Sequence, residues 1–132
     1  MQKYVALLAY GTHNIGGGID QFWLTGDMRI DPMQQVDFLD RLRRGVLPVS
    51  KRSQELVRDI LPTVKVGDAV IRYKTGLLGA ERGQPSLGWL VGWAEKGAQQ
   101  TVFAMNMDCK TPEHTPARMT VTQQCLTDIG AI

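Results

Sequence analysis

The sequence predicts an α+β protein in which helices come first, a three-stranded antiparallel meander follows, and one more helix comes last. Two observations predict this class. Apolar residues recur at helical spacing before Pro62, and runs rich in β-branched and aromatic residues follow it. A doubly wound α/β fold would instead alternate strands with helices. The 132 residues are the size of a single domain. We expect residues 1–62 to be mainly helical and residues 63–132 to carry the sheet and the last helix.

The beginning of the chain predicts a short helix, or the end of a longer one, over residues 2–9. Residues 10–19 should form a turn-rich loop, because three consecutive glycines allow tight turns. A later helix is expected from its cap at Ser50 to Pro62. Its apolar side would consist of Leu56, Val57 and Ile60.

The clearest helix is predicted to begin after Asp31. Asp31 suits the N-cap, Pro32 the first helical position and Gln34 the third, as in a capping box. Gly45 is the residue type that commonly ends a helix. The apolar face of this helix is predicted to consist of Met33, Val36, Leu39 and Leu42, with Phe38 beside it.

The second half predicts the three strands of the meander, at residues 69–77, 87–95 and 101–108. The loop Lys96-Gly97-Ala98 should make the last two a hairpin. Trp89 and Trp93 fall on one face of their strand, which favours packing as their role. The last helix is expected over residues 117–129, with Met119, Leu126 and Ile129 available for packing.

Composition excludes several classes of function. The formal charge is only +2, so charge gives no argument for a nucleic-acid partner or a membrane surface. No apolar run approaches the roughly 20 residues of a membrane span, and the first residues lack the features of a signal peptide. Cys109 and Cys125 have no metal-site spacing, and His13 and His114 stand alone, so we expect no metal site. Both cysteines are predicted to be buried thiols rather than a disulfide.

Five stretches together resemble a class D (OXA-type) serine β-lactamase. They are Tyr10-Gly11-Thr12, the segment IGGGIDQFW (15–23), Lys74-Thr75-Gly76, GWLVGWAEK (88–96) and VFAMNMD (102–108). A lysine-threonine-glycine triplet alone is a weak signal, but the order and spacing of all five match over essentially the whole chain.

This resemblance implies roles for the triplet and its neighbours. Lys74 would support proton transfer and bind the acidic substrate, while Thr75 and Arg118 would hydrogen-bond the β-lactam carboxylate. Leu77 would give a backbone N–H to the oxyanion hole. These roles are chemically reasonable, because a strand edge has free N–H groups and an arginine can hold a carboxylate through two bonds. Gly76 has no side chain, so a ligand can lie against the strand there.

The resemblance also implies supporting residues, one of which departs from the family pattern. The family's second signature is usually Tyr-Gly-Asn, and Thr12 replaces the asparagine after Tyr10 and Gly11. A hydroxyl keeps one hydrogen bond but not the full amide pattern. Trp23 would pack over the family's carboxylated lysine, and we expect it to be a core residue in either case. That lysine is not in this chain, so no cofactor is expected.

The family's nucleophile is the serine of an S-x-x-K motif, and this chain has none. Its serines are Ser50, Ser53 and Ser86, and none has a lysine three residues on. The family's S-x-V motif is missing as well. In the family both motifs precede the segment QKYVALLAYG, so we expect the chain to correspond to the C-terminal half of a class D domain, beginning at a methionine that is normally internal.

The leading hypothesis is therefore a part of a periplasmic serine β-lactamase, inactive alone, that would bind β-lactams when the other half completes it. In the family, strands of that other half flank the strand at residues 101–108. We therefore expect this chain to form a homo-oligomer or to pair with a complementing N-terminal half. One alternative is a fragment of a β-lactam-sensing receptor domain. Another is a non-catalytic relic whose fold has rearranged, which an altered strand order would support.

Overall fold

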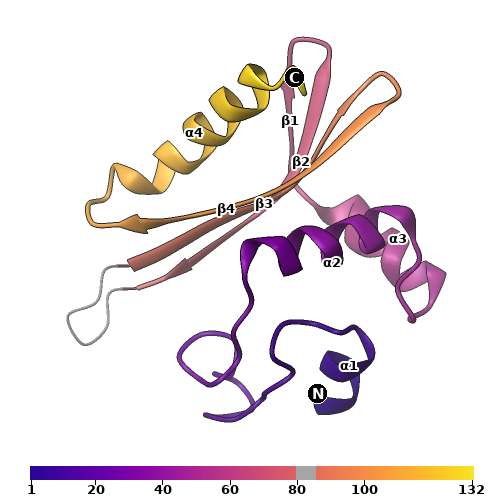
Figure 1. The fold of residues 1–132 in the computed structure, drawn as a ribbon, viewed down its shortest axis with the longest axis vertical. Helices are drawn as coiled ribbons and strands as arrows, with labels where there is room; N and C mark the ends of the chain where they lie inside the picture. The colour runs from indigo at the N-terminus through magenta and orange to yellow at the C-terminus, as the bar shows by residue number, and fades with distance from the viewer. Residues whose placement is uncertain (80–85) are drawn as a thin grey trace. The chain divides into compact units, whose positions relative to one another are not determined.

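The computed structural model describes residues 1–79 and 86–132 of the chain (Figure 1). The chain divides into two compact units, residues 1–60 and residues 61–132. The first unit contains α1 (Gln2–Leu7), α2 (Pro32–Arg44) and α3 (Lys51–Ile60), connected by loops. In the second unit, the described residues form an antiparallel sheet followed by a helix. Helices, sheet and final helix thus follow one another in the predicted order.

Both long helices of the first unit begin at the predicted caps. The Gln34 backbone N–H donates to Asp31 Oδ1 at 2.8 Å, and the Asp31 N–H donates to Gln34 Oε1 at 3.1 Å, which completes the capping box of α2. The helix ends at Gly45, whose φ of 68° is left-handed. Ser50 caps α3 by accepting the Ser53 N–H at 3.1 Å.

The buried side of α2 differs from the prediction at two positions. Leu39 and Leu42 are buried as expected, but Met33 is 75% exposed and Gln35 is buried instead. The reason is a hydrogen bond, because the Gln35 side-chain oxygen accepts the Tyr10 hydroxyl at 2.8 Å. A satisfied amide can be buried at little cost. A separate apolar cluster of this unit consists of Val5, Phe22 and Met28, with Tyr10 and Ile15 packed against it.

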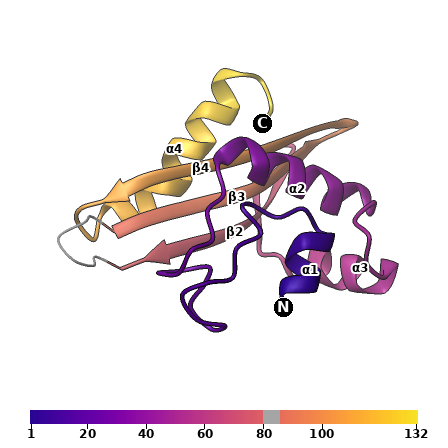
Figure 2. The same ribbon diagram turned by 60° about the horizontal axis from the view of Figure 1, so that its bottom comes forward.

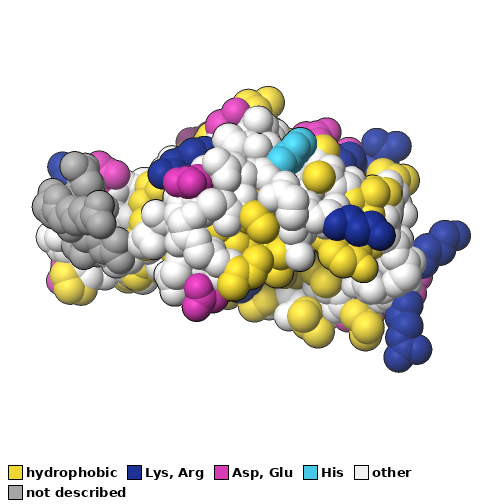
Figure 3. All heavy atoms as spheres, turned by 90° about the horizontal axis from the view of Figure 1, so that it is seen from below, with side chains coloured by type: hydrophobic (Ala, Val, Ile, Leu, Met, Phe, Trp, Pro, Cys, Tyr) yellow, Lys and Arg dark blue, Asp and Glu magenta, His cyan; other side chains and the backbone are white. Residues whose placement is uncertain are grey.

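The apolar side of α3 is exposed, which corrects the prediction for this helix. Leu56, Val57 and Ile60 are 51%, 41% and 75% exposed. The buried residue of α3 is Gln54, whose amide bonds the backbone of the α2–α3 connection at Leu47 N, Leu47 O and Val49 O. This polar contact orients the helix and turns the side of Leu56 and Ile60 outward. Figure 3 shows hydrophobic side chains at the surface on one face of the molecule.

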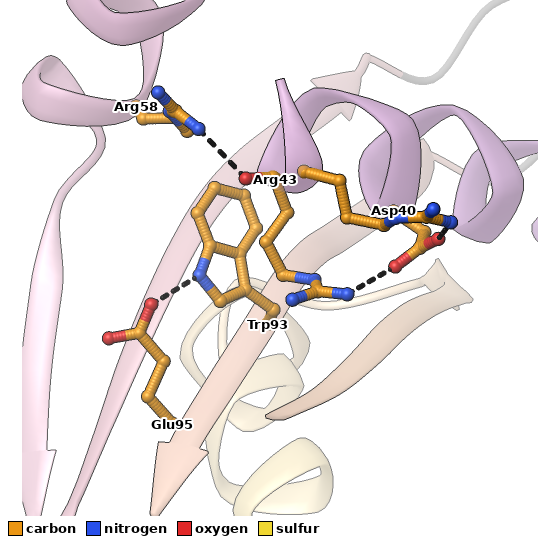
Figure 4. A network of polar contacts seen from close by, with 6 residues as sticks. Asp40, Arg43, Arg58, Trp93 and Glu95 are labelled. Atoms are coloured by element: carbon orange, nitrogen blue, oxygen red, sulfur yellow. Dashed lines mark hydrogen bonds and ion pairs between the residues drawn. The ribbon is translucent and has the colours of Figure 1, made fainter. Parts of the chain in front are cut away.

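A second polar contact also joins α2 to α3. Arg58 Nη1 donates to the Arg43 carbonyl at 2.8 Å, and the Arg43 side chain contacts Asp40 one turn earlier on α2 (Figure 4). Asp40 also accepts from Arg44. The hydrogen bond from Arg58 therefore connects α3 to the end of α2.

The sheet of the second unit has four strands among the described residues, not the predicted three. They are β1 (Thr63–Val66), β2 (Ala69–Leu78), β3 (Ser86–Lys96) and β4 (Gln99–Cys109), paired antiparallel in that order. The prediction missed β1, which has only four residues and lies between Pro62 and the Gly67-Asp68 turn. The predicted hairpin between β3 and β4 is confirmed, with Gly97 at a φ of 58° in its turn.

One face of the sheet is covered by α4 (His114–Asp128) and the residues after it (Figures 1 and 2). The cluster beneath this cover contains Ile71 of β2, Ala94 of β3, Leu126 of α4 and Ala131. The register pairs Ile71 with Ala94, so both side chains point to the same face. On β3 the buried Trp93 donates its indole N–H to Glu95 Oε1 at 2.8 Å (Figure 4). The Trp93 side chain is 1% exposed, which agrees with the packing role predicted for it.

The last helix begins three residues before its predicted start. His114 and Thr115 are helical because Pro116 lies in the first turn, where no backbone N–H is needed for the helix ladder. The two cysteines are both free, as predicted. Cys109 is buried, but Cys125 is exposed, so the expected burial is wrong for Cys125.

Candidate substrate-binding edge

The Lys74-Thr75-Gly76 triplet lies where β2 extends beyond its neighbour β1. The last residue pair between these strands is Thr63 with Arg72, after which the Tyr73 N–H donates to the Pro62 carbonyl at 3.0 Å. The triplet and Leu77 are exposed, and Leu77 is 50% exposed. The far half of β2 therefore has an edge that β1 does not cover.

Backbone alternation determines which groups lie on this edge. In an antiparallel strand the N–H and C=O of one residue point to the same side, and the next residue points to the other. Because Tyr73 points toward β1, Thr75 and Leu77 point to the same side, beyond the end of β1. The Lys74 ammonium also reaches this edge, where it donates to the Thr75 carbonyl at 2.6 Å.

The two polar side chains of the triplet lie on opposite faces of the sheet. Thr75 has the same parity as Ile71 and so shares the face covered by α4. Lys74 lies on the other face, opposite Val91 of β3. A ligand along the open edge of β2 would thus find the ammonium on one side and the hydroxyl on the other.

Arg118 joins three segments from a buried position on α4. It is 4% exposed. Its Nη1 donates to the carbonyls of Gly76 and Trp89 at 2.5 and 2.8 Å. Its Nε donates to the Thr115 carbonyl at 2.9 Å. Nη2 is the guanidinium nitrogen left without a hydrogen bond among the described residues. A carboxylate would therefore meet one nitrogen of Arg118, not a two-nitrogen fork.

Gly88 makes room for this arginine. A Cβ at Gly88 would lie 2.6 Å from Cys109 Sγ and 2.9 Å from Arg118 Cδ. No side chain fits there without movement, so the glycine is needed where Arg118 and the thiol pack against β3. Sequence reasoning did not single out this role of Gly88. The sequence did contain a signal for this role, because a glycine inside an apolar strand often marks a place where another group packs closely against the backbone.

Tyr10, Gly11 and Thr12 lie in the first unit, where they pair with the segment before α2. The Thr12 N–H donates to the Arg29 carbonyl at 2.8 Å, and the Arg29 N–H donates to Thr12 Oγ1 at 3.1 Å. A Cβ at Gly11 would lie 2.3 Å from the Arg29 carbonyl oxygen, so only glycine fits. Burial raises the pKa of Tyr10, which donates its hydroxyl to Gln35. These contacts position the loop, and they occupy the Thr12 hydroxyl.

Trp23 is not a core residue. It is 52% exposed and makes an edge-to-face contact with Phe22, with ring centroids 4.8 Å apart. Phe22 is the buried member of the pair. Adjacent residues of this loop point in different directions, and the Phe22 ring occupies the core beside Val5 and Met28.

The described part of the chain contains neither a group of side chains suited to a metal ion nor a helix suited to a membrane. Over residues 1–79 and 86–132, no three His, Cys, Asp or Glu side chains gather where they could hold a metal ion. Over the same residues, each helix is too short or too polar to cross a membrane.

Comparison with known proteins identifies relatives over the whole chain. β-Lactamase OXA-5 of Pseudomonas aeruginosa is 40% identical over 133 aligned residues, which cover 100% of this chain and 50% of that protein. β-Lactamase OXA-48 of Klebsiella pneumoniae is 40% identical over 96% of this chain and 47% of its own length. The chain thus spans about half the length of the curated relatives it matches, as a C-terminal half would.

Solved structures agree with the sequence relatives. The class D β-lactamase YbXI from Nostoc superposes with a TM-score of 0.90 at 37% identity, covering 100% of this chain and 55% of that one. FUS-1 (OXA-85) from Fusobacterium nucleatum gives the same TM-score at 34% identity. A match of this quality over the whole chain argues against a rearranged fold.

A family model confirms the assignment. Residues 1–129 match the penicillin binding protein transpeptidase domain. The chain therefore belongs to the family of penicillin-binding-protein transpeptidase domains, among the relatives of the class D β-lactamases.

Proposed function

We propose that this chain supplies the substrate-binding wall of a class D serine β-lactamase and does not hydrolyse β-lactams alone. The observation that carries the proposal is the open edge of β2, where the Lys74 ammonium and the N–H groups of Thr75 and Leu77 lie together. A cation beside aligned donors suits an anion.

The chemistry of a β-lactam fits this edge. The substrate carries a carboxylate, and attack on its ring carbonyl develops a negative charge on oxygen. The Leu77 N–H would stabilise that oxyanion, and losing one such donor typically costs about 10²–10³ in rate. Thr75 and Nη2 of Arg118 would bind the carboxylate, with Lys74 adding its charge and supporting proton transfer. Gly76 would leave the strand open to the ligand.

Hydrolysis would need groups from outside this chain. The family reaction acylates a serine and then releases the product with an activated water. The serines here are Ser50, Ser53 and Ser86, and none precedes a lysine by three residues. We expect the other half of the complete domain to supply the nucleophile and the base. We also expect the complete protein to be periplasmic. This chain should associate with that half or with a second copy of itself.

A binding measurement tests the proposal. Titration of a penicillin into the ¹⁵N-labelled chain should shift the amide signals of Thr75 and Leu77, while a chromogenic cephalosporin stays intact. Lys74→Ala should weaken this binding about tenfold, because it removes the charge at the edge. The matched control is Lys96→Ala, an exposed lysine beside the β3–β4 turn, which should leave binding unchanged.

Two results would contradict the proposal. One is hydrolysis of the cephalosporin at an enzyme's rate by a preparation whose mass matches this chain alone. The other is a titration that leaves Thr75 and Leu77 unmoved, or shifts them equally in the wild type and in Lys74→Ala.

A further inference from the structure

The segment IGGGIDQFW (15–23) is part of a closed loop in the first unit. Residues 13–28 make up this loop, and the residues on either side of it, Thr12 and Arg29, pair with each other. Within the loop, the Asp27 N–H donates to the Gly16 carbonyl at 3.0 Å. A compact loop whose ends meet and whose own side chains pack inside it is an Ω-loop, and loops of this class often carry functional residues.

Glycines allow the beginning and the end of the 13–28 loop to approach each other. A Cβ at Gly17 would lie 2.5 Å from Gly26 Cα, and Gly17 has a left-handed φ of 86°. A Cβ at Gly26 would lie 2.5 Å from the Gly16 carbonyl oxygen and 2.5 Å from Phe22 Cα. No side chain fits at either position without movement of the backbone, so the closed form of the loop accounts for both glycines.

The Arg29 side chain binds the end of the same loop. Its Nη1 donates to the Gly26 carbonyl at 2.5 Å and to the Met28 carbonyl at 2.7 Å. Hydrogen bonds from an ionised donor are roughly twice as strong as those between neutral groups. One guanidinium nitrogen therefore fixes the turn that returns the chain from the loop to the segment before α2.

Principle contacts lead from this turn to Trp23. The Met28 N–H donates to the Phe22 carbonyl at 3.1 Å, and the Met28 and Phe22 side chains share one apolar cluster. The Trp23 ring meets the Phe22 ring edge to face, with an angle of 88° between the ring planes. The place of the Trp23 indole thus depends on Phe22, and the place of Phe22 depends on the turn that Arg29 holds.

We propose that Arg29 is a positioning residue for Trp23, which it holds in place through the end of the 13–28 loop and the Phe22 ring. Side chains of a site need such support, because small displacements are costly to function. The role of Arg29 rests on the proposed function, since Trp23 is a site residue by resemblance to the class D enzymes. Because its test uses no β-lactam, it can fail while the β2 edge still binds a penicillin, and it can succeed where that binding fails.

Indole NMR signals of the ¹⁵N-labelled chain test this role. Arg29→Met keeps a long side chain and removes its donors, so the Nε1–H signal of Trp23 should shift and amide hydrogen exchange at Met28 should become about tenfold faster. The Trp93 indole, which lies in the second unit, should keep its signal. The matched control is Arg52→Met at an exposed arginine of α3, which should leave the Trp23 signal and the exchange at Met28 unchanged.

Two further variants distinguish positioning from general stability. Arg29→Lys keeps a cation that can donate to a carbonyl, and it should recover part of both changes. Arg29→Gln keeps a neutral donor and should shift the Trp23 signal in the same direction by a smaller amount, so it serves the comparison even if Arg29→Met does not fold. A Trp23 signal that Arg29→Met and Arg29→Gln leave in place would overturn the proposal. So would a Trp23 signal that moves only together with that of Trp93, or an Arg29→Lys protein that recovers nothing.

Discussion

At the scale of single residues, Arg118 shows how one buried side chain can connect three segments of the second unit. Three backbone carbonyls accept hydrogen bonds from its Nε and Nη1, and they belong to α4, β2 and β3. The guanidinium therefore holds the triplet strand to its neighbours. Its spacing from Gly76 is 42 residues and from Trp89 is 29 residues, so no local pattern could have predicted these bonds.

Removing the Arg118 guanidinium should destabilise the protein. Arg118→Gln removes hydrogen bonds from a charged donor to three partly buried carbonyls, and one hydrogen bond to a charged group contributes about 1.5–3 kcal/mol. We expect the free energy of unfolding in urea to fall by about 2–3 kcal/mol. Arg118→Lys keeps the charge but cannot reach three carbonyls, so it should recover only part of the loss. The control is Arg52→Gln, at an exposed arginine of α3, and an equal loss there would contradict the argument.

Substitution of Gly88 should destabilise the protein about as much as substitution of Arg118, the residue that packs against it. Gly88→Ala places a methyl group against Cys109 Sγ and Arg118 Cδ, and overpacking of this kind costs about 1–3 kcal/mol. The double variant Gly88→Ala with Cys109→Ala should melt at a higher temperature than Gly88→Ala alone, because removing the sulfur makes room for the new methyl group. Gly79→Ala is the control, since a Cβ there meets nothing within 4 Å. A Gly88→Ala protein that melts with the wild type would disprove the close packing.

At the scale of elements, the sequence predicted best where the signal was local. The capping box of α2 and the β3–β4 hairpin are formed by neighbouring residues, and both are confirmed. The strand β1 depends on its pairing with β2 and is too short for its own pattern, although the Gly67-Asp68 turn could have revealed it. The exposed side of α3 was unpredictable for the opposite reason, because a polar contact of Gln54 overrides its apolar periodicity.

Asp40 of α2 gives this helix a pH dependence. The hydrogen bond from Arg43, with a smaller contribution from Arg44, lowers the pKa of Asp40 below its ordinary value of 3.8. A lowered pKa in the folded state stabilises the fold above the unfolded-state pKa, and this contribution disappears as the pH falls through the folded-state value. Asp40→Asn should therefore cost less than about 1 kcal/mol at pH 7, and the cost should vanish in acid.

Unfolding measured at a series of pH values checks this expectation. The gap between wild type and Asp40→Asn should narrow steadily below pH 4 or so, and high salt should narrow it at neutral pH as well. A gap that stays constant from neutral to strongly acidic pH would show that Asp40 acts through packing instead.

At the scale of the whole molecule, the sequence predicted the protein family better than it predicted the details of the fold. The family was predicted from five stretches spread over the chain, and the match over residues 1–129 confirms it. The triplet was correctly placed on a strand, but its uncovered edge depends on where β1 stops. The exposure of Trp23 could not be predicted either, because it depends on which of two adjacent rings fills the core of the first unit.

The sequence around the three serines leads to a prediction for this chain. After incubation with a penicillin and acid quenching, the mass of this chain should be unchanged, because none of its serines has the lysine that the family nucleophile needs. A full-length relative such as OXA-5 should gain the mass of the drug under the same conditions. An adduct mapped to Ser50, Ser53 or Ser86 would contradict this expectation.

The alternation of β2 also limits how this part of the chain can change in length. Deleting or inserting one residue between the β1–β2 turn and Lys74 would exchange the faces of Lys74 and Thr75 and turn the Leu77 N–H away from the open edge. A change of two residues would preserve all three. Relatives that retain this arrangement of the β2 edge should therefore differ in length here by even numbers, and odd-numbered differences would identify sequences that have lost it.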